Sequence, residues 1–137
     1  MNFFIKIYDQ FTSFSNTIKT SAKNLFLYSF IKVYSAILLF INLVLWVATI
    51  IMRHYLNQDI AILHYNVDFG IDLIGSKNYL FLIPVFSLFF IILNQIILIK
   101  FLKNDSFKFW SHFLLAFLLL FNIFLILILF SIYSINF

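Results

Sequence analysis

The chain has 137 residues, of which 64% are hydrophobic and 10% are charged, and its formal net charge is +4 at pH 7. A soluble domain usually has about 25% charged residues, and a small one has too little interior to bury this much apolar surface. The composition therefore excludes an ordinary soluble protein. The basic side chains flank apolar stretches, which predicts anionic lipid headgroups rather than nucleic acid as their partners. The absence of cysteine excludes disulfides and thiolate metal sites.

Residues 1–24 are expected to form an amphipathic helix rather than a signal peptide, because no compact apolar core is followed by a small-residue cleavage site. Apolar side chains recur there at helical spacing and form one stripe, opposite the lysines. The stripe consists of Phe4, Ile7, Tyr8, Phe11, Phe14, Ile18, Ala22 and Leu25. This pattern predicts a helix lying in the plane of the membrane interface. A helix packed against the rest of the protein is the alternative.

Three uncharged apolar stretches follow, at residues 33–52, 79–99 and 111–131. Each has about 20 residues, enough at 1.5 Å per residue to cross a hydrocarbon core of about 30 Å. Pro84, near the start of the second stretch, predicts a kink or a late helix start, because proline has no N–H. The predicted fold is an all-α membrane protein: one domain over residues 1–137, with an amphipathic N-terminal helix and three transmembrane helices.

The basic residues predict how the spans are oriented. Seven of them lie before the first span or between the second and third, whereas only Arg53 and Lys77 lie in the loop over residues 53–78. Because cytoplasmic segments carry the excess of Lys and Arg, we expect the N-terminus inside and the loop and C-terminus outside. The predicted location is the inner, or cytoplasmic, membrane. Aromatic residues at the span ends agree with the two interfaces: Tyr28, Tyr34 and Trp110 for the inner one, and Tyr55, Tyr79 and Tyr133 for the outer one.

The loop over residues 53–78 is the one long polar interruption of the sequence. Polar and apolar side chains alternate there over six positions: His64, Tyr65, Asn66, Val67, Asp68 and Phe69. A period of two predicts an extended segment with its polar side chains on one face. Gly70 and Gly75 permit turns, and Ser76 or Asn78 is placed to cap the second span.

This loop also holds the candidate site, whose residues are His64, Asn66, Asp68, Gly70, Asp72 and Gly75. His64 and Asp68, with Asp72 or Asp59, have the side chains that coordinate a divalent cation, and His–Asp pairs can also move protons. No strict metal motif is present. We favour the alternative, in which these groups hold the loop on the membrane surface through turns and hydrogen bonds. Neither a metal ion nor another cofactor is predicted.

Each span also carries at least one amide side chain. Asn42 and Asn122 fall near the middle of their spans, and Asn94 with Gln95 falls closer to the predicted inner side. An amide in hydrocarbon needs a hydrogen-bond partner, so these four side chains are expected to join the helices to one another. The alternative is a permeation or substrate path. No acidic or lysine side chain lies deep in a span, which argues against an ion-coupled transporter.

The run His64–Tyr65–Asn66, with Gly70, Asp72 and Gly75–Ser76–Lys77 and then the span containing Pro84, resembles a bacterial membrane-protein family. That family has a Pro-x-His-x-x-x-x-Gly loop between two membrane helices and no assigned function for most members. It includes immunity proteins against the sporulation-delaying toxin. The resemblance covers about residues 35–100, and small uncharacterised members are the most similar. It implies a fold rather than an activity.

Motifs of known enzyme classes are absent from the sequence, including G-x-S-x-G, H-E-x-x-H and the phosphate-binding glycine loop. We therefore expect a small non-enzymatic integral membrane protein that acts through helix packing and its outer loop. Its expected contacts are the bilayer and a protein partner or a second copy. Two alternatives are an accessory subunit of a larger membrane complex and a metal-dependent membrane enzyme that uses His64 and Asp68.

Overall fold

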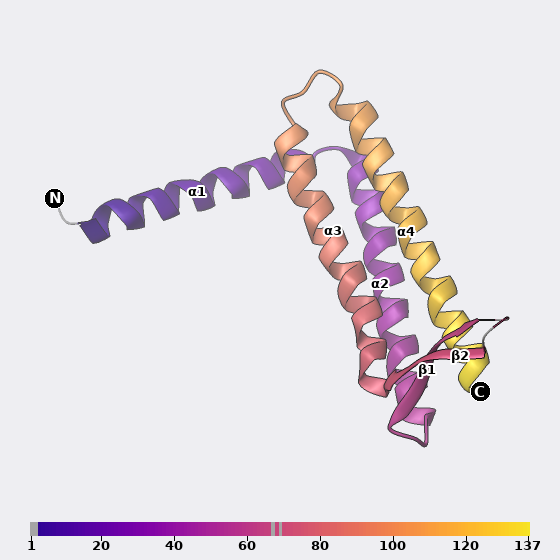
Figure 1. Cartoon of the computed structure of the whole chain (residues 1–137). Helices are drawn as coiled ribbons and strands as arrows, with labels where there is room; N and C mark the ends of the chain where they lie inside the picture. Colours follow the sequence, from indigo (N-terminus) through magenta and orange to yellow (C-terminus); the bar gives the residue numbers. More distant parts are fainter. Residues whose placement is uncertain (1–2, 67, 69) are drawn as a thin grey trace.

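The computed structural model describes residues 3–66, 68 and 70–137, and it is mostly helical (Figure 1). Three of its helical segments, at residues 29–55, 77–101 and 107–136, are long and apolar enough to span a membrane. This confirms the predicted fold of an N-terminal helix followed by three transmembrane helices. The elements in chain order are α1 (Phe3–Leu25), α2 (Ser29–Tyr55), β1 (Ile60–Asn66), β2 (Gly70–Ser76), the 3-10 helix η1 (Lys77–Phe81), α3 (Leu82–Phe101) and α4 (Phe107–Asn136).

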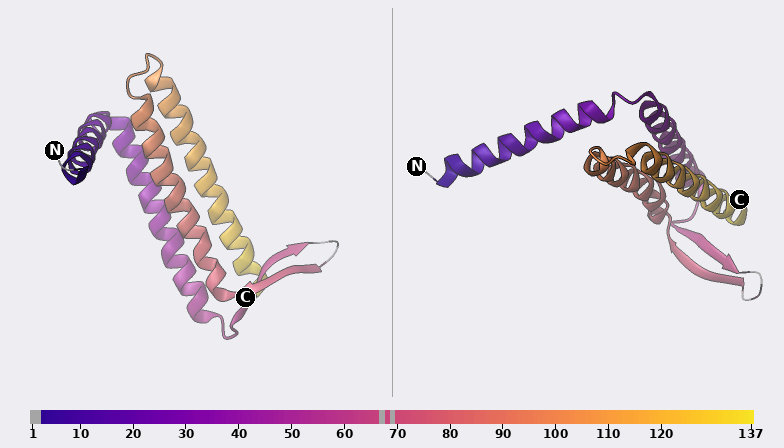
Figure 2. Two further views of the ribbon diagram at one scale, coloured as in Figure 1. Left: turned by 60° about the vertical axis from the view of Figure 1, so that its left-hand side comes forward. Right: turned by 90° about the horizontal axis from the view of Figure 1, so that it is seen from above.

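The helices α2, α3 and α4 pack side by side as a bundle (Figures 1 and 2). Their buried side chains recur every three or four residues, which is the spacing of a coiled-coil seam. In α2 this seam consists of Ile31, Ser35, Leu38, Asn42, Leu45, Thr49 and Met52. Buried leucine and isoleucine form one apolar cluster toward each end of the bundle. Polar side chains of the same seams lie between and among these clusters.

The spanning helices extend beyond the apolar stretches that predicted them. Helix α2 begins at Ser29, before Lys32, and α4 runs from Phe107 to Asn136. A helix can continue past the hydrocarbon because its backbone N–H and C=O groups are already hydrogen-bonded within the helix. A lysine near its end reaches the interface with its flexible side chain. Pro84 lies in the first turn of α3, where an N–H would have no partner within the helix. The chain thus takes the predicted late helix start, after η1.

Helix α1 runs away from the bundle, crosswise to the spans (Figures 1 and 2). Its last residue, Leu25, is buried in one of the apolar clusters, and α1 meets α3 there. The helix has 23 residues, so it is about 35 Å long at 1.5 Å per residue. Its bounds agree closely with the predicted helix over residues 1–24. A helix that joins the bundle at its last residues and otherwise runs away from it has the geometry that an interfacial position requires.

The loop between α2 and η1 forms an antiparallel β-hairpin, where the sequence predicted only an extended segment. Gly70 opens β2 with a φ of +78°, a conformation that side-chain-bearing residues rarely adopt. The register shifts around His64, and such bulges increase the twist of a hairpin. Val67 and Phe69 lie outside the described residues. The hairpin projects sideways from the end of the bundle opposite α1 (Figures 1 and 2).

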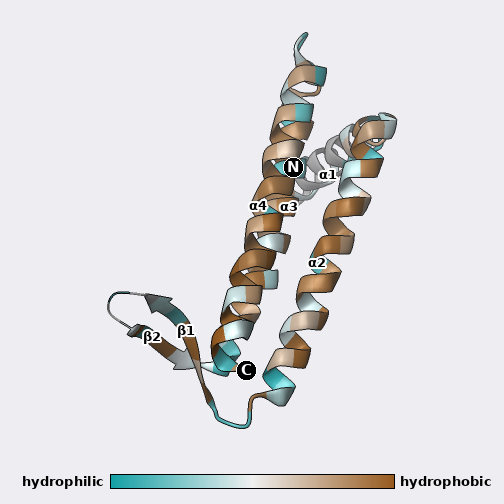
Figure 3. Cartoon of the chain, turned by 90° about the vertical axis from the view of Figure 1, so that its right-hand side faces the viewer, coloured by the Kyte–Doolittle hydropathy of each residue, from teal (hydrophilic) through white to brown (hydrophobic). Residues whose placement is uncertain are grey.

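The outer surface of the bundle is apolar along most of its length. Figure 3 shows hydrophobic colours along α2, α3 and α4, with hydrophilic colours concentrated toward the helix ends. Large apolar side chains such as Phe40, Phe117 and Leu120 are about two-thirds exposed, at 65% each. These faces are turned toward the surroundings and not into a core, as expected where lipid takes the place of water.

Candidate functional site

A chain of hydrogen bonds joins the three spans at their midpoints. The Asn42 side-chain N–H group donates to Ser87 Oγ and to the Pro84 carbonyl, at 2.9 Å in each case. The Ser87 hydroxyl donates to Asn122 Oδ1 at 2.5 Å, and Asn122 Nδ2 donates to the Leu118 carbonyl at 2.9 Å. Ser87 and Asn122 are 0% exposed and Asn42 is 6% exposed. One hydroxyl on α3 thus connects an amide on α2 with an amide on α4.

A second polar level lies nearer the end of the bundle that holds α1. Gln95 Nε2 donates to Ser35 Oγ at 3.0 Å, which joins α3 to α2. Asn94 Nδ2 donates to the Leu114 carbonyl at 3.2 Å, which joins α3 to α4. Adjacent residues on α3 therefore contact different neighbours, because successive helical residues are about 100° apart. Both polar levels tie α3 to each of the other spans.

Three buried oxygen atoms in the spans have no hydrogen-bond partner among the described residues: Thr49 Oγ1, Asn94 Oδ1 and Gln95 Oε1. Thr49 is fully buried on α2, seven residues beyond Asn42. An unmade hydrogen bond in an apolar surrounding costs free energy, so the oxygens of Asn94 and Gln95 weaken the second polar level in part, whereas Thr49 belongs to neither level. Every side chain in the two levels is an amide or a hydroxyl, which makes them suited to holding helices together rather than to acid–base chemistry.

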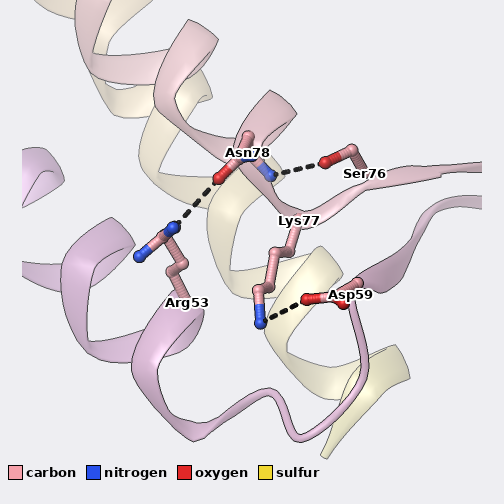
Figure 4. Close-up of polar contacts among 5 residues, drawn as sticks. All are labelled: Arg53, Asp59, Ser76, Lys77 and Asn78. Atoms are coloured by element: carbon pink, nitrogen blue, oxygen red, sulfur yellow. Dashed lines mark hydrogen bonds and ion pairs between the residues drawn. The ribbon is translucent and has the colours of Figure 1, made fainter.

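The base of the hairpin is fixed to the helices by polar contacts that Figure 4 shows together. Arg53 Nε, near the end of α2, donates to Asn78 Oδ1 at 3.0 Å (Figure 4). The Arg53 guanidinium also lies over the Phe81 ring. Lys77 Nζ pairs with Asp59 Oδ1 at 3.0 Å, and the Lys77 backbone N–H donates to the Asp59 carbonyl. Ser76 Oγ accepts from the Asn78 backbone N–H and caps η1, as one of the two predicted capping residues. The two basic residues of the 53–78 loop therefore anchor the hairpin.

A single side chain of α4 holds the free edge of β1. Asn136 Oδ1 accepts from the Ile62 backbone N–H at 2.9 Å, and Asn136 Nδ2 donates to the Ile62 carbonyl at 2.8 Å. The amide group has the same donor and acceptor pair as a neighbouring strand would offer. It therefore ends the sheet on the β1 side and ties the hairpin to a residue 74 positions away.

The candidate residues of the loop are distributed along the hairpin. His64 Nδ1 and Asp72 Oδ1 are 2.6 Å apart, on side chains that are 60% and 44% exposed. Asp68 lies in the turn, and Asp59 is engaged by Lys77. Over residues 3–66, 68 and 70–137, no group of three His, Cys, Asp or Glu side chains is arranged to hold a metal ion. The structure therefore pairs His64 with Asp72, but it does not gather Asp68 with them into a three-residue site.

The two glycines of the hairpin have different reasons to be glycine. Gly70 needs its positive φ, and a methyl group there would meet open space. A methyl group on Gly75 would come within 2.7 Å of the Leu63 and Tyr79 side chains. Gly75 therefore permits a close approach of the strands and η1. Asn66 ends β1 opposite Gly70, next to the turn.

The sequence reasoning missed three important residues. Ser87 is the centre of the middle polar level but looks like an ordinary small residue in an apolar span. Ser35 and Asn136 were also passed over. A signal was available for some of them, because Ser35, Asn42 and Thr49 recur at seven-residue spacing, as do Ser87 and Asn94. Seven residues are one heptad, so these side chains fall on one seam of each helix. Asn136 carries no comparable signal.

Comparison with known proteins gives no further assignment: no family model, curated protein or solved structure matches the chain. The resemblance of the 35–100 region to a bacterial membrane family therefore stays a prediction. Function has to be argued from the bundle and the hairpin themselves.

Proposed function

We propose that this chain is a non-enzymatic integral membrane protein that binds a partner protein through the outer edge of its hairpin. In this proposal the bundle is the scaffold, the two polar levels keep its helices in register, and β2 is the contact. This deepens the interpretation of a protein that acts through helix packing and its outer loop. It also agrees with the alternative of an accessory subunit, since a subunit needs a surface for its complex.

The observation that carries the proposal is the edge of β2. Ile62 turns its backbone N–H and C=O away from β2 and toward Asn136. Ile62 lies opposite Ile74, and in an antiparallel ladder both members of such a pair turn these groups away from each other. The N–H and C=O of Ile74 therefore point to the outer edge of β2. Helix α4 packs against β1, and β2 has no comparable helix contact among the described residues.

An open strand edge binds other chains, and proteins that do not use it cover it or place charges on it. Here the strand carries three apolar side chains that are about half exposed: Ile71 at 49%, Leu73 at 52% and Ile74 at 56%. Backbone groups of an added strand would pair with the edge, and its side chains would contact these residues. An extended segment of a partner protein is therefore the kind of ligand that fits.

The test combines a photo-crosslinker at Ile71 with two substitutions of Ile74, in cells that contain the natural partners. Ile74→Pro removes the outward N–H, whereas Ile74→Ala keeps it and removes the side chain. We expect a defined crosslinked protein in the parent chain, loss of that product with Ile74→Pro, and retention with Ile74→Ala. A product that survives Ile74→Pro, or crosslinks to lipid alone, would refute the proposal. A crosslink between two copies would identify the partner as the chain itself.

A further inference from the structure

An apolar groove of about 380 Å³ lies where the hairpin crosses the outer ends of α3 and α4. Leu63, Leu73 and Ile74 of the hairpin form one side of it. Ile83 of α3, with Ile128 and Ile132 of α4, forms the other. Its volume falls in the range of small-molecule sites, about 300–1,000 Å³. The groove shares the Leu73 and Ile74 side chains with the strand whose edge is proposed to bind a partner. It uses none of the outward backbone groups of β2, so a lipid could bind there even if no partner strand pairs with that edge.

The lining of the groove selects the chemistry of its occupant. No charged side chain lines it, and almost all of its surface is apolar. A peptide backbone placed there would lose its hydrogen bonds to water and find none in return, which costs several kcal/mol per group in an apolar medium. A hydrocarbon chain has no such groups to satisfy. The groove therefore suits a flexible apolar chain and disfavours an extended peptide.

The position of the groove indicates where a hydrocarbon chain would come from. Ile83, Ile128 and Ile132 belong to the segments that can span a membrane, and Leu82 beside them is 49% exposed on the surface of the bundle. Tyr79, 55% exposed, stands at the same end, where an aromatic side chain with a polar tip suits the headgroup level. We propose that the groove binds one acyl chain of a phospholipid of the outer leaflet.

The hairpin makes this site different from the rest of the lipid-facing surface. A lipid tail on a bare helix surface contacts protein on one side. In the groove it contacts the helices on one side and the hairpin on the other. The hairpin side is fixed before the lipid arrives, by Asn136 on Ile62, by Lys77 on Asp59 and by the close contact at Gly75. A preformed site loses little conformational freedom when it binds. The bound chain should therefore exchange more slowly than the lipids around it.

The first experiment uses the unaltered protein in vesicles made of equal parts phosphatidylglycerol and phosphatidylcholine, with a diazirine on the phosphatidylcholine acyl chain. After photolysis we expect the label to concentrate on peptides that contain Ile83, Ile128 and Leu73. A free fatty acid with the same diazirine forms a second arm and distinguishes a free chain from a phospholipid. Labelling spread evenly along all the lipid-facing surfaces of α2, α3 and α4 would overturn the proposal.

The second experiment measures retained lipid by native mass spectrometry after extraction in mild detergent. Ile128→Trp fills the groove, and Leu43→Trp adds the same side chain to a lipid-exposed face of α2 as the matched control. We expect the parent protein and Leu43→Trp to retain one phospholipid, and Ile128→Trp to lose at least tenfold in occupancy. Equal retention by both variants would contradict the proposal. If Ile128→Trp fails to fold, the labelling of the unaltered protein still decides the matter.

Discussion

Ser87 is the residue on which the middle of the bundle depends, because its hydroxyl both accepts from Asn42 and donates to Asn122. Each of those amides also bonds a backbone carbonyl, Pro84 for the first and Leu118 for the second. Loss of the hydroxyl therefore separates the two amides without leaving either one wholly unpartnered. The expected penalty is moderate and not catastrophic.

Replacing Ser87 by alanine should lower the free energy of unfolding by about 1 kcal/mol, since hydrogen bonds between membrane helices are worth about 0.6 kcal/mol on average. Reversible unfolding in mixed micelles measures the change. Ser134→Ala is the matched control, because that hydroxyl is exposed and bonds only the Phe130 carbonyl of its own helix. The control should change stability by less than about 0.5 kcal/mol. Equal effects of the two substitutions would contradict the role given to Ser87.

Asn136 and His64 both hold the hairpin through side-chain contacts, but of different strength. Asn136→Ala removes two hydrogen bonds to the Ile62 backbone and should destabilise the hairpin by about 1–2 kcal/mol. His64→Ala removes an exposed pair with Asp72, which is worth less than about 1 kcal/mol. Amide hydrogen exchange over β1 should therefore accelerate clearly in the first variant and only slightly in the second. The reverse order would show that the histidine, and not Asn136, holds the hairpin.

At the scale of elements, α1 and the hairpin are the two parts that leave the bundle, and they do so at opposite ends (Figures 1 and 2). The described side chains near the start of α1 include Ile7 and Tyr8, which are 48% and 68% exposed. On a crosswise helix these belong to the predicted apolar stripe. Lipid at the membrane interface, predicted to be the inner one, would cover what the protein leaves open.

A charge in that stripe should lift α1 from the membrane. Tyr8→Asp is expected to raise the water accessibility of a spin label at Thr12 in vesicles of anionic lipid, because a carboxylate does not enter the apolar part of the interface. Asn16→Asp adds the same charge on the polar face, opposite the centre of the apolar stripe, and should leave the accessibility nearly unchanged. If both substitutions have the same effect, the exposed side chains of α1 are not in contact with lipid.

The hairpin was predicted from the sequence only in part. Alternation around His64 correctly indicated extended backbone over residues 64–66, but β1 ends at Asn66 and Asp68 lies in the turn, not in the predicted extended segment. Gly70 indicated a turn. The pairing of β1 with β2 was not predicted, because the four residues before His64 are all apolar and do not alternate, and the register of the pairing shifts on both sides of His64. The contact that fixes β1 comes from Asn136, 74 residues away. A local pattern carries no information about such a distant partner.

The three spans were predicted more completely than the hairpin, because the lipid environment itself requires long apolar stretches in the sequence. Three stretches without charge have to become helices in a bilayer, where every backbone group needs an internal partner. The late start of α3 followed from Pro84 alone. The arrangement of the spans around Asn42, Ser87 and Asn122 was predicted only in part. The amides predicted contact between helices, but the connecting serine looks like an ordinary small residue of a span.

Helix α1 joins the bundle at one end and α4 ends at the other (Figure 1), and the distribution of basic residues predicts that the N-terminus is inside. Because the sequence has no cysteine, single-cysteine variants give an unambiguous signal. Ser21→Cys should react with a membrane-impermeant maleimide only after the membrane is opened, and Ser134→Cys should react in intact cells. Reaction of both from the same side would contradict the three-span topology.

The polar levels of the bundle contain amides and hydroxyls only. Between Lys32 and Arg53, between Lys77 and Lys100, and after Lys108, no Asp, Glu, Lys or Arg is present. An electrical potential does work only on charge, about 2.3 kcal/mol per elementary charge for each 100 mV. The side chains that hold the helices together are therefore uncharged, and the membrane voltage hardly changes their energy. Energised and de-energised membranes should contain the same bundle.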